Sequence, residues 1–580
     1  MENKICKKCE KQYEVTDDDL DFYKQMSPTF DGKVFKIPAP TLCPDCRRQR
    51  RFAWRNITKI YKRKCDLTEK EIISGYAPNS KYKVYETSEW WSDKWDPMEY
   101  GQEYDPSRSF FEQLKDLDLK VPKMHAVVVD NENSPFTNNV TRAVNSYLIQ
   151  NATNNENCMF GQGLWNNKDC VDCLRIYDCE GCYESSICEK CYQCHHSINS
   201  INSRESYFLD GCTGSANCFA CTNLSNKQYW VYNKQSTKEE FEKTRDEFLA
   251  LSGEAKDQKF AEIRKFLSEQ PKKFAHILDS EDSTGDHLYH SKNLQKTFYA
   301  NGDENLSYCS NVDKVRNSMD YDFWGNETEN ILDCLEVGIN SQNIAFSRSV
   351  YTNCSNIYYS IGVYNSCRNC FGSVGLKQKE YCILNKQFTR DEYEKKVAEI
   401  IEKMIADGEW GQYFPMSMSQ YGYNETIAPE YYPLTKEQAQ AEGINWQDED
   451  FGLKYDGPFY EPKEISEYDP QRNENAKTEQ DALLAGILKC EVSGKPYKIQ
   501  PQELLFYIKN NLQIPRRHPD QRYEDRVAFR NPMSLWHRDC SCQGEYQQHQ
   551  GKCPNEFETS YAPDRPEKVF CESCYQDIIK

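Results

Sequence analysis

One stretch of the chain occurs twice, and this repetition restricts the possible folds more than any other feature of the sequence. The segment from Cys158 to Leu249 matches the sequence found 152 residues further along. The matched pairs include Cys182 with Cys334, Tyr207 with Tyr359, Cys218 with Cys370 and Phe219 with Phe371. So many identities at a single offset indicate a tandem duplication, which is typical of repeat architectures.

A shorter period runs inside each copy. Apolar residues recur about every 12 residues, and Asn, Ser, Asp and Gly stand between them. They are Tyr147, Met159, Val171, Tyr183, Tyr192, Tyr207 and Phe219 in the first copy, and Phe298, Tyr308, Met319, Ile331, Ile344, Ile357 and Phe371 in the second. Short apolar pulses between turn-forming residues are typical of strands and corners. The sequence therefore predicts a duplicated β-solenoid, with either one pulse or two in each coil.

An amphipathic helix is predicted at the end of each copy. Thr237 is followed three residues later by Glu240, and Thr389 by Glu392. This capping-box spacing lets the two side chains bond the free backbone N–H groups at a helix start. We expect each helix to cover the open end of its solenoid, because an uncovered sheet edge promotes aggregation.

Composition limits the location and the partners of the protein. The chain has 580 residues and a formal net charge of −19, which argues against binding nucleic acid or anionic membranes over the whole surface. The first residues form no apolar signal core and no run approaches 18 apolar residues, so we expect a cytoplasmic protein without membrane contact. In a reducing cytosol its 28 cysteines should be thiols or metal ligands.

The N-terminal segment carries a strong metal-binding pattern. Cys6 and Cys9 form one Cys-x-x-Cys pair, and Cys43 and Cys46 form a second. Two such pairs provide the four sulfur ligands that structural Zn²⁺ prefers. The sequence therefore predicts a zinc site here, and a basic stretch interleaved with aromatic residues follows it directly.

The C-terminal segment resembles the N-terminal one when Cys65 is aligned with Cys540. The first site is incomplete in this copy, which has only Cys490 and His518 there. A second site is complete, because Cys571 and Cys574 stand near three further candidate ligands, Cys540, Cys542 and Cys553. We therefore predict two structural zinc ions, one at each end, and interpret His549 as a possible ligand that is more simply a loop residue.

These patterns divide the chain into six segments of a mainly β protein with α additions, in which zinc-ribbon or treble-clef-like modules flank the duplicated solenoid. The segments are a zinc module with a basic stretch (1–125), solenoid copy 1 with its capping helix (126–270), a connector (271–287), solenoid copy 2 with its capping helix (288–412), an acidic Tyr/Pro-rich linker (413–488) and a second zinc module (489–580). The Cys-x-x-Cys pairs between Cys170 and Cys194 could bind metal, but the second copy has Ile331, Asn340 and Asn343 at three of these positions, which favours filling of the coil.

Several phrases of the sequence look familiar. They are Cys43-Pro-Asp-Cys-Arg47, Tyr61-Lys-Arg-Lys-Cys65, Trp90-Trp-Ser-Asp-Lys-Trp95, Gly422-Tyr-Asn-Glu-Thr426 and Asn555-Glu-Phe-Glu-Thr559. Over nearly the whole chain they resemble a family of uncharacterised Cys-rich zinc-ribbon proteins with a repetitive β-solenoid-like centre, predicted in small-genome uncultivated bacteria. The resemblance implies a cytosolic zinc protein and implies no particular activity.

The leading interpretation is a non-enzymatic protein whose zinc modules bind RNA or DNA, with RNA favoured, because positive charge gathers beside both zinc sites. The candidate nucleic-acid-binding residues are Arg47, Arg48, Arg50, Arg51, Arg55, Lys62, Arg63, Arg516, Arg517, Arg522, Arg526 and Arg530. An alternative is a structural or protein-interaction scaffold in which these arginines hold the modules against the acidic solenoid. A minor alternative is a carbohydrate-active enzyme that uses Asp320, Asp322 and Asp333. The common nucleotide-binding and hydrolase motifs are absent, so we expect no enzyme and no small-molecule substrate.

Overall fold

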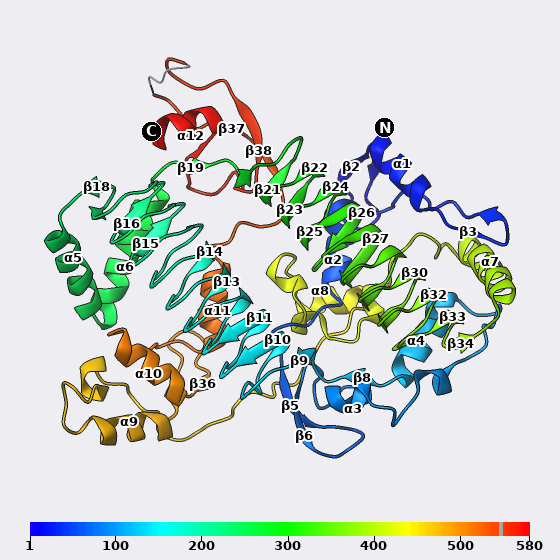
Figure 1. Cartoon of the computed structure of the whole chain (residues 1–580), viewed down its shortest axis with the longest axis horizontal. Helices are drawn as coiled ribbons and strands as arrows, with labels where there is room; N and C mark the ends of the chain where they lie inside the picture. The colour runs from blue at the N-terminus through cyan, green and yellow to red at the C-terminus, as the bar shows by residue number, and fades with distance from the viewer. Residues whose placement is uncertain (545–548, 580) are drawn as a thin grey trace.

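The computed structural model describes residues 1–544 and 549–579. Two stacks of parallel strands lie next to each other, and helical and cysteine-rich segments cover their margins (Figure 1). The prediction of a strand-rich chain with helical additions and a cysteine cluster towards each end is confirmed.

The first stack is built from strands that pair with the strand next in the chain. It contains β9 (Val128–Val129), β10 (Asn138–Val144), β11 (Gln150–Glu156), β12 (Gln162–Trp165), β13 (Leu174–Tyr177), β14 (Ser186–Glu189), β15 (Tyr207–Asp210), β16 (Phe219–Thr222), β17 (Trp230–Val231) and β18 (Lys234–Gln235). Gln150 pairs with Gln162, and Gln162 with Leu174, so the register advances by 12 residues. Only the last pair, β17 with β18, is antiparallel.

The second stack has the same parallel order. It contains β20 (Ile277–Leu278), β21 (Gly285–Tyr289), β22 (Lys292–Gln295), β23 (Thr297–Asn301), β24 (Glu304–Ser307), β25 (Ser310–Asp313), β26 (Val315–Asp322), β27 (Thr328–Val337), β28 (Gln342–Ala345), β29 (Arg348–Tyr351), β30 (Ser355–Tyr358), β31 (Ile361–Tyr364), β32 (Arg368–Phe371), β33 (Glu380–Ile383) and β34 (Lys386–Gln387). Its register advances by 12 residues at first, and by 13 from Ser318 to Ile331 and beyond.

A three-residue rule underlies both stacks. In β11 and the turn after it, Asn151, Asn154 and Asn157 have left-handed backbone, with φ of 51°, 55° and 53°. Asn tolerates this conformation better than most residues because its short side chain bonds locally. The residues that follow them, such as Ala152 and Cys158, are buried. Small buried side chains therefore recur every third residue, and this spacing accounts for the repeated Cys-x-x-Cys pattern.

The N-terminal module packs against the second stack. It contains β1 (Glu2–Ile5), β2 (Gln12–Val15), α1 (Asp17–Met26), β3 (Thr29–Phe30), β4 (Lys33–Val34), α2 (Pro44–Phe52), β5 (Tyr61–Lys64), β6 (Glu71–Ser74), β7 (Val84–Tyr85), α3 (Thr87–Trp91), the 3₁₀ helix η1 (Pro97–Tyr100), α4 (Phe110–Lys120) and β8 (Lys123–Met124). Helix α2 lies on β26 and β27. Phe110 of α4 packs edge-on against Phe371, with the ring centres 5.3 Å apart.

The C-terminal module packs against the first stack instead. It contains α9 (Ala476–Ala485), β35 (Leu488–Lys489), β36 (Pro496–Tyr497), α10 (Pro501–Lys509), α11 (Pro519–Val527), β37 (Trp536–Asp539), β38 (Glu556–Thr559), β39 (Val569–Phe570) and α12 (Glu572–Ile579). Arg526 of α11 donates to the carbonyl of Phe160 at 3.1 Å. Strand β39 pairs with β19 (Lys272–Lys273), which lies between the two stacks in the chain. The two end modules are thus exchanged relative to chain order.

The predicted helices at the ends of the two stacks are confirmed as α5 (Lys238–Ala250) and α7 (Arg390–Asp407). In α7 the side chains of Thr389 and Glu392 each bond the backbone N–H of the other, and the helix ends at the left-handed Gly408. A further helix, α6 (Gly253–Ser268), follows α5. The segment after α7 has short elements, η2 (Met416–Met418), η3 (Tyr423–Glu425), η4 (Ala428–Glu430), α8 (Lys436–Ala441) and η5 (Ile465–Tyr468). Among the described residues, no helix combines the length and apolar character that a membrane crossing needs.

Candidate metal centres

Four cysteines of the N-terminal module form one compact group. The Sγ atoms of Cys6, Cys9, Cys43 and Cys46 all lie within 4.8 Å of one another. The Sγ atoms of Cys9 and Cys43 are 3.7 Å apart, close to the ~3.8 Å that four sulfurs around a tetrahedral zinc require. Cys9 is exposed and the other three are buried, so the group is suited to a structural metal site near the surface.

Two elements with defined local geometry bring these sulfurs together. Cys6 and Cys9 lie in the turn after β1, where the N–H of Cys6 donates to the carbonyl of Lys11 at 3.0 Å. Cys43 precedes Pro44 at the start of α2, and its N–H donates to the Sγ of Cys6 at 3.3 Å. A hydrogen bond from the thiol of Cys46 lowers the pKa of Cys43 to about 5. A helix start also favours negative charge, so Cys43 is set up to act as a thiolate ligand.

The C-terminal module has a second group of four cysteines. It consists of Cys540 after β37, Cys553 before β38, and Cys571 and Cys574 at the start of α12, all buried. The Sγ of Cys553 is 3.6 Å from that of Cys574 and 3.9 Å from that of Cys571. The sequence left Cys540, Cys542 and Cys553 open as completing ligands, and the geometry selects Cys540 and Cys553.

Cys542 belongs to an overlapping group with His549 and Cys574. The Nε2 of His549 is 3.5 Å from the Sγ of Cys542 and 3.1 Å from that of Cys574. The interpretation of His549 as a simple loop residue is therefore wrong in one respect, since its ring nitrogen lies at ligand distance from two thiols.

Another group, His276, Asp286 and His287, escaped the sequence analysis. Its carboxylate is already occupied, because Asp286 accepts hydrogen bonds from the N–H of His276, the N–H of His287 and the hydroxyl of Ser560. The two imidazole rings stack in parallel, with centres 4.5 Å apart. Adjacent strands create this contact, and no spacing motif in the sequence could have indicated it.

The cysteines of the first stack have a different environment. Among the residues that the structure describes, the groups of three or more ligand atoms within 4.8 Å of one another include none of the cysteines from Cys170 to Cys194. The thiol of Cys170 instead donates to the carbonyls of Lys168 and Cys179, at 3.2 and 3.6 Å. Ser185, at an equivalent position, makes the same pair of bonds to Tyr183 and Cys194. These thiols fill the stack and bond its backbone.

The arginines of α2, predicted as nucleic-acid ligands, are buried against the second stack. Arg47 pairs with Asp320 at 2.7 Å, and Arg50 with Asp333 at 2.7 Å. Arg51 is fully buried and reaches three carboxylates, at 2.6 Å in Asp322, 2.8 Å in Asp333 and 3.2 Å in Asp320. Burial alone would lower the pKa of Arg51, but these carboxylates raise it well above its usual value.

Arg48 and Arg55 complete this arginine row. Arg48 lies 3.7 Å from a carboxylate oxygen of Asp322 and donates to the carbonyl of Met533 at 2.9 Å. Arg55 pairs with Glu336, and its guanidinium lies 3.8 Å from the ring centre of Phe323. All five arginines of this row (Arg47, Arg48, Arg50, Arg51 and Arg55) are buried. The prediction that they contact phosphates is therefore wrong, because their donors are used inside the protein.

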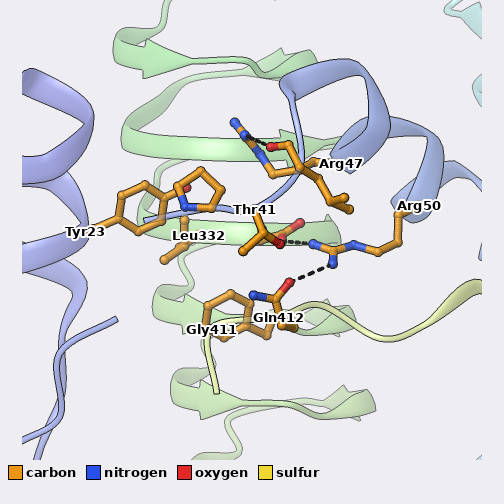
Figure 2. A pocket seen from close by; sticks show the side chains of 11 residues that line it. Tyr23, Thr41, Arg47, Arg50, Leu332, Gly411 and Gln412 are labelled. Atoms are coloured by element: carbon orange, nitrogen blue, oxygen red, sulfur yellow. Dashed lines mark hydrogen bonds and ion pairs between the residues drawn. The ribbon is translucent and has the colours of Figure 1, made fainter. Parts of the chain in front are cut away.

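Figure 2 shows how closely the row fits. Arg47 and Arg50 extend from α2 towards the second stack, and Arg50 also approaches the side chain of Gln412 at 3.4 Å. The space that these residues enclose is about 10 Å³, which is room for about one water molecule. Asp333 and its neighbours are closed off from any substrate, so the carbohydrate-enzyme alternative has no accessible carboxylate pair there.

The C-terminal module has a corresponding row on α11. Arg522 and Arg526 both pair with Asp172 of the first stack, at 2.6 and 2.8 Å. Arg530, half-buried, pairs with Glu430 at 3.0 Å. The prediction of nucleic-acid contact is wrong for these three residues for the same reason, because burial and a carboxylate partner remove their charge from the surface.

The remaining candidates stay nearer the solvent. Arg63 pairs with Asp66 at 2.9 Å, and Arg517 with Asp525 at 2.6 Å. Arg516 pairs with Asp257 and also with Glu491, at 3.3 Å in the latter. Lys62 is exposed. Most of the predicted basic surface is thus neutralised by the chain's own acidic residues.

Comparison with known proteins adds little to this picture. No family model matches the chain, and no curated protein matches it. Among solved structures, a protein from Desulfovibrio desulfuricans G20 that is provisionally named an acetyltransferase aligns over 50% of this chain and 82% of its own, with 8% identity and a TM-score of 0.10. A likeness this weak carries no argument about fold or function.

Proposed function

We propose that this protein is a non-enzymatic, zinc-bound scaffold in which two cysteine-ligated modules are locked onto two β-solenoids. The observation that carries the proposal is the burial of the two arginine rows. Arg51 and Arg522, which the sequence assigned to nucleic acid, instead join the end modules to the strand stacks through buried carboxylates. Removing one partner of such a pair leaves an uncompensated buried charge, so these contacts hold the modules in one arrangement.

The solenoid part of the proposal rests on register and conformation together. Each strand pairs in parallel with the chain 12 or 13 residues later. Left-handed residues every third position, such as Asn151 and Asn154, turn the chain at regular intervals. Ladders of side-chain bonds, such as Asn154 to Asn166 at 2.9 Å, connect successive levels. These features support one coil of 12 or 13 residues, in which each level buries its small side chains on the next.

The duplication is supported by the way the end modules dock. Arg522 and Arg526 occupy the positions of Arg47 and Arg51 when the two modules are aligned. In both modules these residues lie on the helix after the first ligand turn and meet aspartates of a strand stack. One ancestral pair of module and stack, copied once, explains why the same contact is made twice.

Zinc is the metal that we assign to both four-cysteine groups. Four thiolates at tetrahedral spacing suit Zn²⁺ and leave no open coordination position, which is typical of structural sites. Such binding can contribute on the order of 10 kcal/mol to the folding of a small module. The cytosolic zinc-protein family that the sequence resembles is consistent with this assignment.

The proposed partner is a protein with a basic surface. The chain has a net charge of −19, and the buried rows withdraw positive charge from its exterior, so the exposed surface is still more acidic than the composition indicates. An acidic surface steers basic partners and repels phosphate backbones. RNA or DNA binding through Lys62 and Arg516 remains the competing outcome of the test below.

The test is fluorescence anisotropy of the purified full chain with labelled RNA, labelled DNA and a labelled lysine-rich peptide, each at two salt concentrations. We expect salt-dependent binding of the basic peptide and none of the nucleic acids, together with at least two zinc ions per chain in elemental analysis. Tight nucleic-acid binding that the double variant Lys62→Glu/Arg516→Glu abolishes would reverse the proposal. Absence of zinc would remove it entirely.

A further inference from the structure

The C-terminal module has more metal ligands than one zinc ion can use. Beside the group of Cys540, Cys553, Cys571 and Cys574 stands the overlapping group of Cys542, His549 and Cys574. The two groups share the thiol of Cys574. Six ligand side chains therefore converge where the N-terminal module has four.

The additional ligands come from an insertion in a turn that both modules possess. In the N-terminal module the turn between β5 and β6 closes with a bond from Cys65 N–H to the carbonyl of Lys70. In the C-terminal module the corresponding bond runs from Cys540 to Asn555. Cys553 precedes β38 by the same three residues by which Thr68 precedes β6. Cys540 and Cys553 are thus the ligands of the basic turn, and Cys542 and His549 lie in the added residues.

We propose that Cys542, His549 and Cys574 bind a second zinc ion, with the Cys574 thiolate bridging it to the ion of the four-cysteine group. This proposal rests on the metal site assigned above and extends it to three zinc ions per chain. The second ion has three protein ligands, so a water molecule or a small external ligand completes its coordination, as at zinc sites that exchange ligands.

Electrostatics favours two ions over one. Five cysteines converge at this site, and all five are buried. If all are thiolates, a single Zn²⁺ leaves three net negative charges in a buried place, whereas two ions leave one. Uncompensated buried charge is costly, so a second cation stabilises the arrangement. The neutral imidazole of His549 adds a ligand without adding charge.

The distances support a shared thiolate. The Nε2 of His549 lies 3.5 Å from the Sγ of Cys542 and 3.1 Å from the Sγ of Cys574, near the ~3.5 Å between N and S ligands of a tetrahedral zinc. The Sγ of Cys574 also lies 3.6 Å from that of Cys553 in the neighbouring group. One sulfur thus faces both ligand sets.

The experiment is zinc counting by elemental analysis of the wild-type full chain, the double variant Cys542→Ser/His549→Gln and a matched control, His537→Gln. His537 is an exposed histidine of β37 that pairs with Glu556 and Glu558. We expect three zinc ions in the wild type, two in the double variant and three in the control. Two ions in the wild type and in the double variant would overturn the second site and leave the proposed function intact. Fewer than two ions in the wild type would contradict both.

X-ray absorption at the zinc edge of the wild type gives a result that does not depend on the folding of any variant. A bridged pair predicts a zinc–zinc scattering path and a nitrogen contribution from His549. A first shell of sulfur alone, without a zinc–zinc path, would refute the shared site.

Discussion

At the residue scale, the cysteines of this chain have two unrelated roles. Those of the end modules lie in turns and helix starts that gather four sulfurs, as Cys6 and Cys43 do. Those of the first stack occupy every third position, where Ser and Ala also occur, and donate to backbone carbonyls. Cys-x-x-Cys spacing is therefore produced both by a ligand turn and by the three-residue rule of the stack, and spacing alone does not distinguish them.

The charged side chain with the most buried contacts in this account is Arg51. Arg51→Ala leaves Asp322 and Asp333 without their partner, so we expect a loss of about 3–5 kcal/mol, since a single buried charge is left unpaired. Hydrogen exchange of the α2 amides measures this loss. The control is Arg316→Ala, whose pair with Glu329 lies at the surface and whose removal should cost less than about 1 kcal/mol. An equal loss in both variants would contradict the role given to the buried row.

Asp303 provides a prediction about pH. It is buried in the second stack, and burial raises its pKa to about 8, against the smaller opposing effect of hydrogen bonds from the N–H groups of Val315 and Asn301. Because the folded pKa is above the unfolded value of about 3.9, the folded state keeps a proton that the unfolded state releases. Its stabilising effect is complete below pH ~4 and is lost as the pH rises through 8, by at most ~1.4 kcal/mol per pH unit.

The variant Asp303→Asn cannot ionise. Thermal unfolding of wild type and variant at intervals from pH 5 to pH 9 should therefore show the variant gaining stability relative to the wild type as the pH rises. The exposed Asp279→Asn serves as the control. Parallel curves for wild type and Asp303→Asn would show that Asp303 is ionised throughout this range.

At the scale of elements, each strand stack is a ladder that is held together by repetition. Side-chain bonds such as Asn293 to Asn305 and Asn305 to Asn317 link successive levels at 2.8 and 3.0 Å. The interior positions admit only small side chains because the chain turns every few residues. A stack of this kind tolerates exchange between Cys and Ser and resists enlargement.

We expect Cys182→Ser to change stability by less than about 1 kcal/mol, because a hydroxyl can replace the thiol bonds to Glu180 and Cys191. Cys182→Leu should cost about 1–3 kcal/mol through overpacking. Thermal unfolding measures both, and elemental analysis should find the same zinc content in each variant. A loss of metal in Cys182→Ser would instead identify a cluster within the stack.

Helix α7 carries the capping box that the sequence predicted. Thr389→Ala removes the side-chain acceptor for the N–H of Glu392, so we expect a loss of about 1 kcal/mol in the hydrogen-exchange stability of the first turn of α7. Thr389→Ser, which keeps the acceptor, should retain most of the wild-type protection. If the two variants behave alike, the cap contributes nothing measurable.

At the scale of the whole molecule, the end modules are exchanged relative to chain order. The N-terminal module docks on the second stack and the C-terminal module on the first, through Arg51 and Arg522 respectively. Helix α2 combines both fixings, because its first turn carries the metal ligands Cys43 and Cys46 and its later turns carry the buried arginines. Loss of metal should therefore loosen a module from its ligand end.

Chelation provides the corresponding prediction. Incubation with a strong zinc chelator should increase hydrogen exchange in β1, β2, β37, β38 and α12, because the ligands Cys6, Cys540 and Cys574 lose their common ion. The strand stacks should keep their protection, since their ladders contain no metal ligand in this assignment. Restoring zinc should reverse the change. Simultaneous loss of protection in the stacks would show that they depend on the metal as well.

What the sequence determined by itself was short-range. The three-residue spacing of Cys6 with Cys9, the cap of Thr389 with Glu392 and the recurring apolar pulses all depend on contacts between near neighbours, whose geometry follows from the chain itself. The partners of the arginines were decided by tertiary structure, because Arg51 and Asp322 lie 271 residues apart and no local rule connects them. Folding likewise selected Cys553 over Cys542 for the C-terminal four-cysteine group, since an inserted turn sets which sulfur faces Cys571.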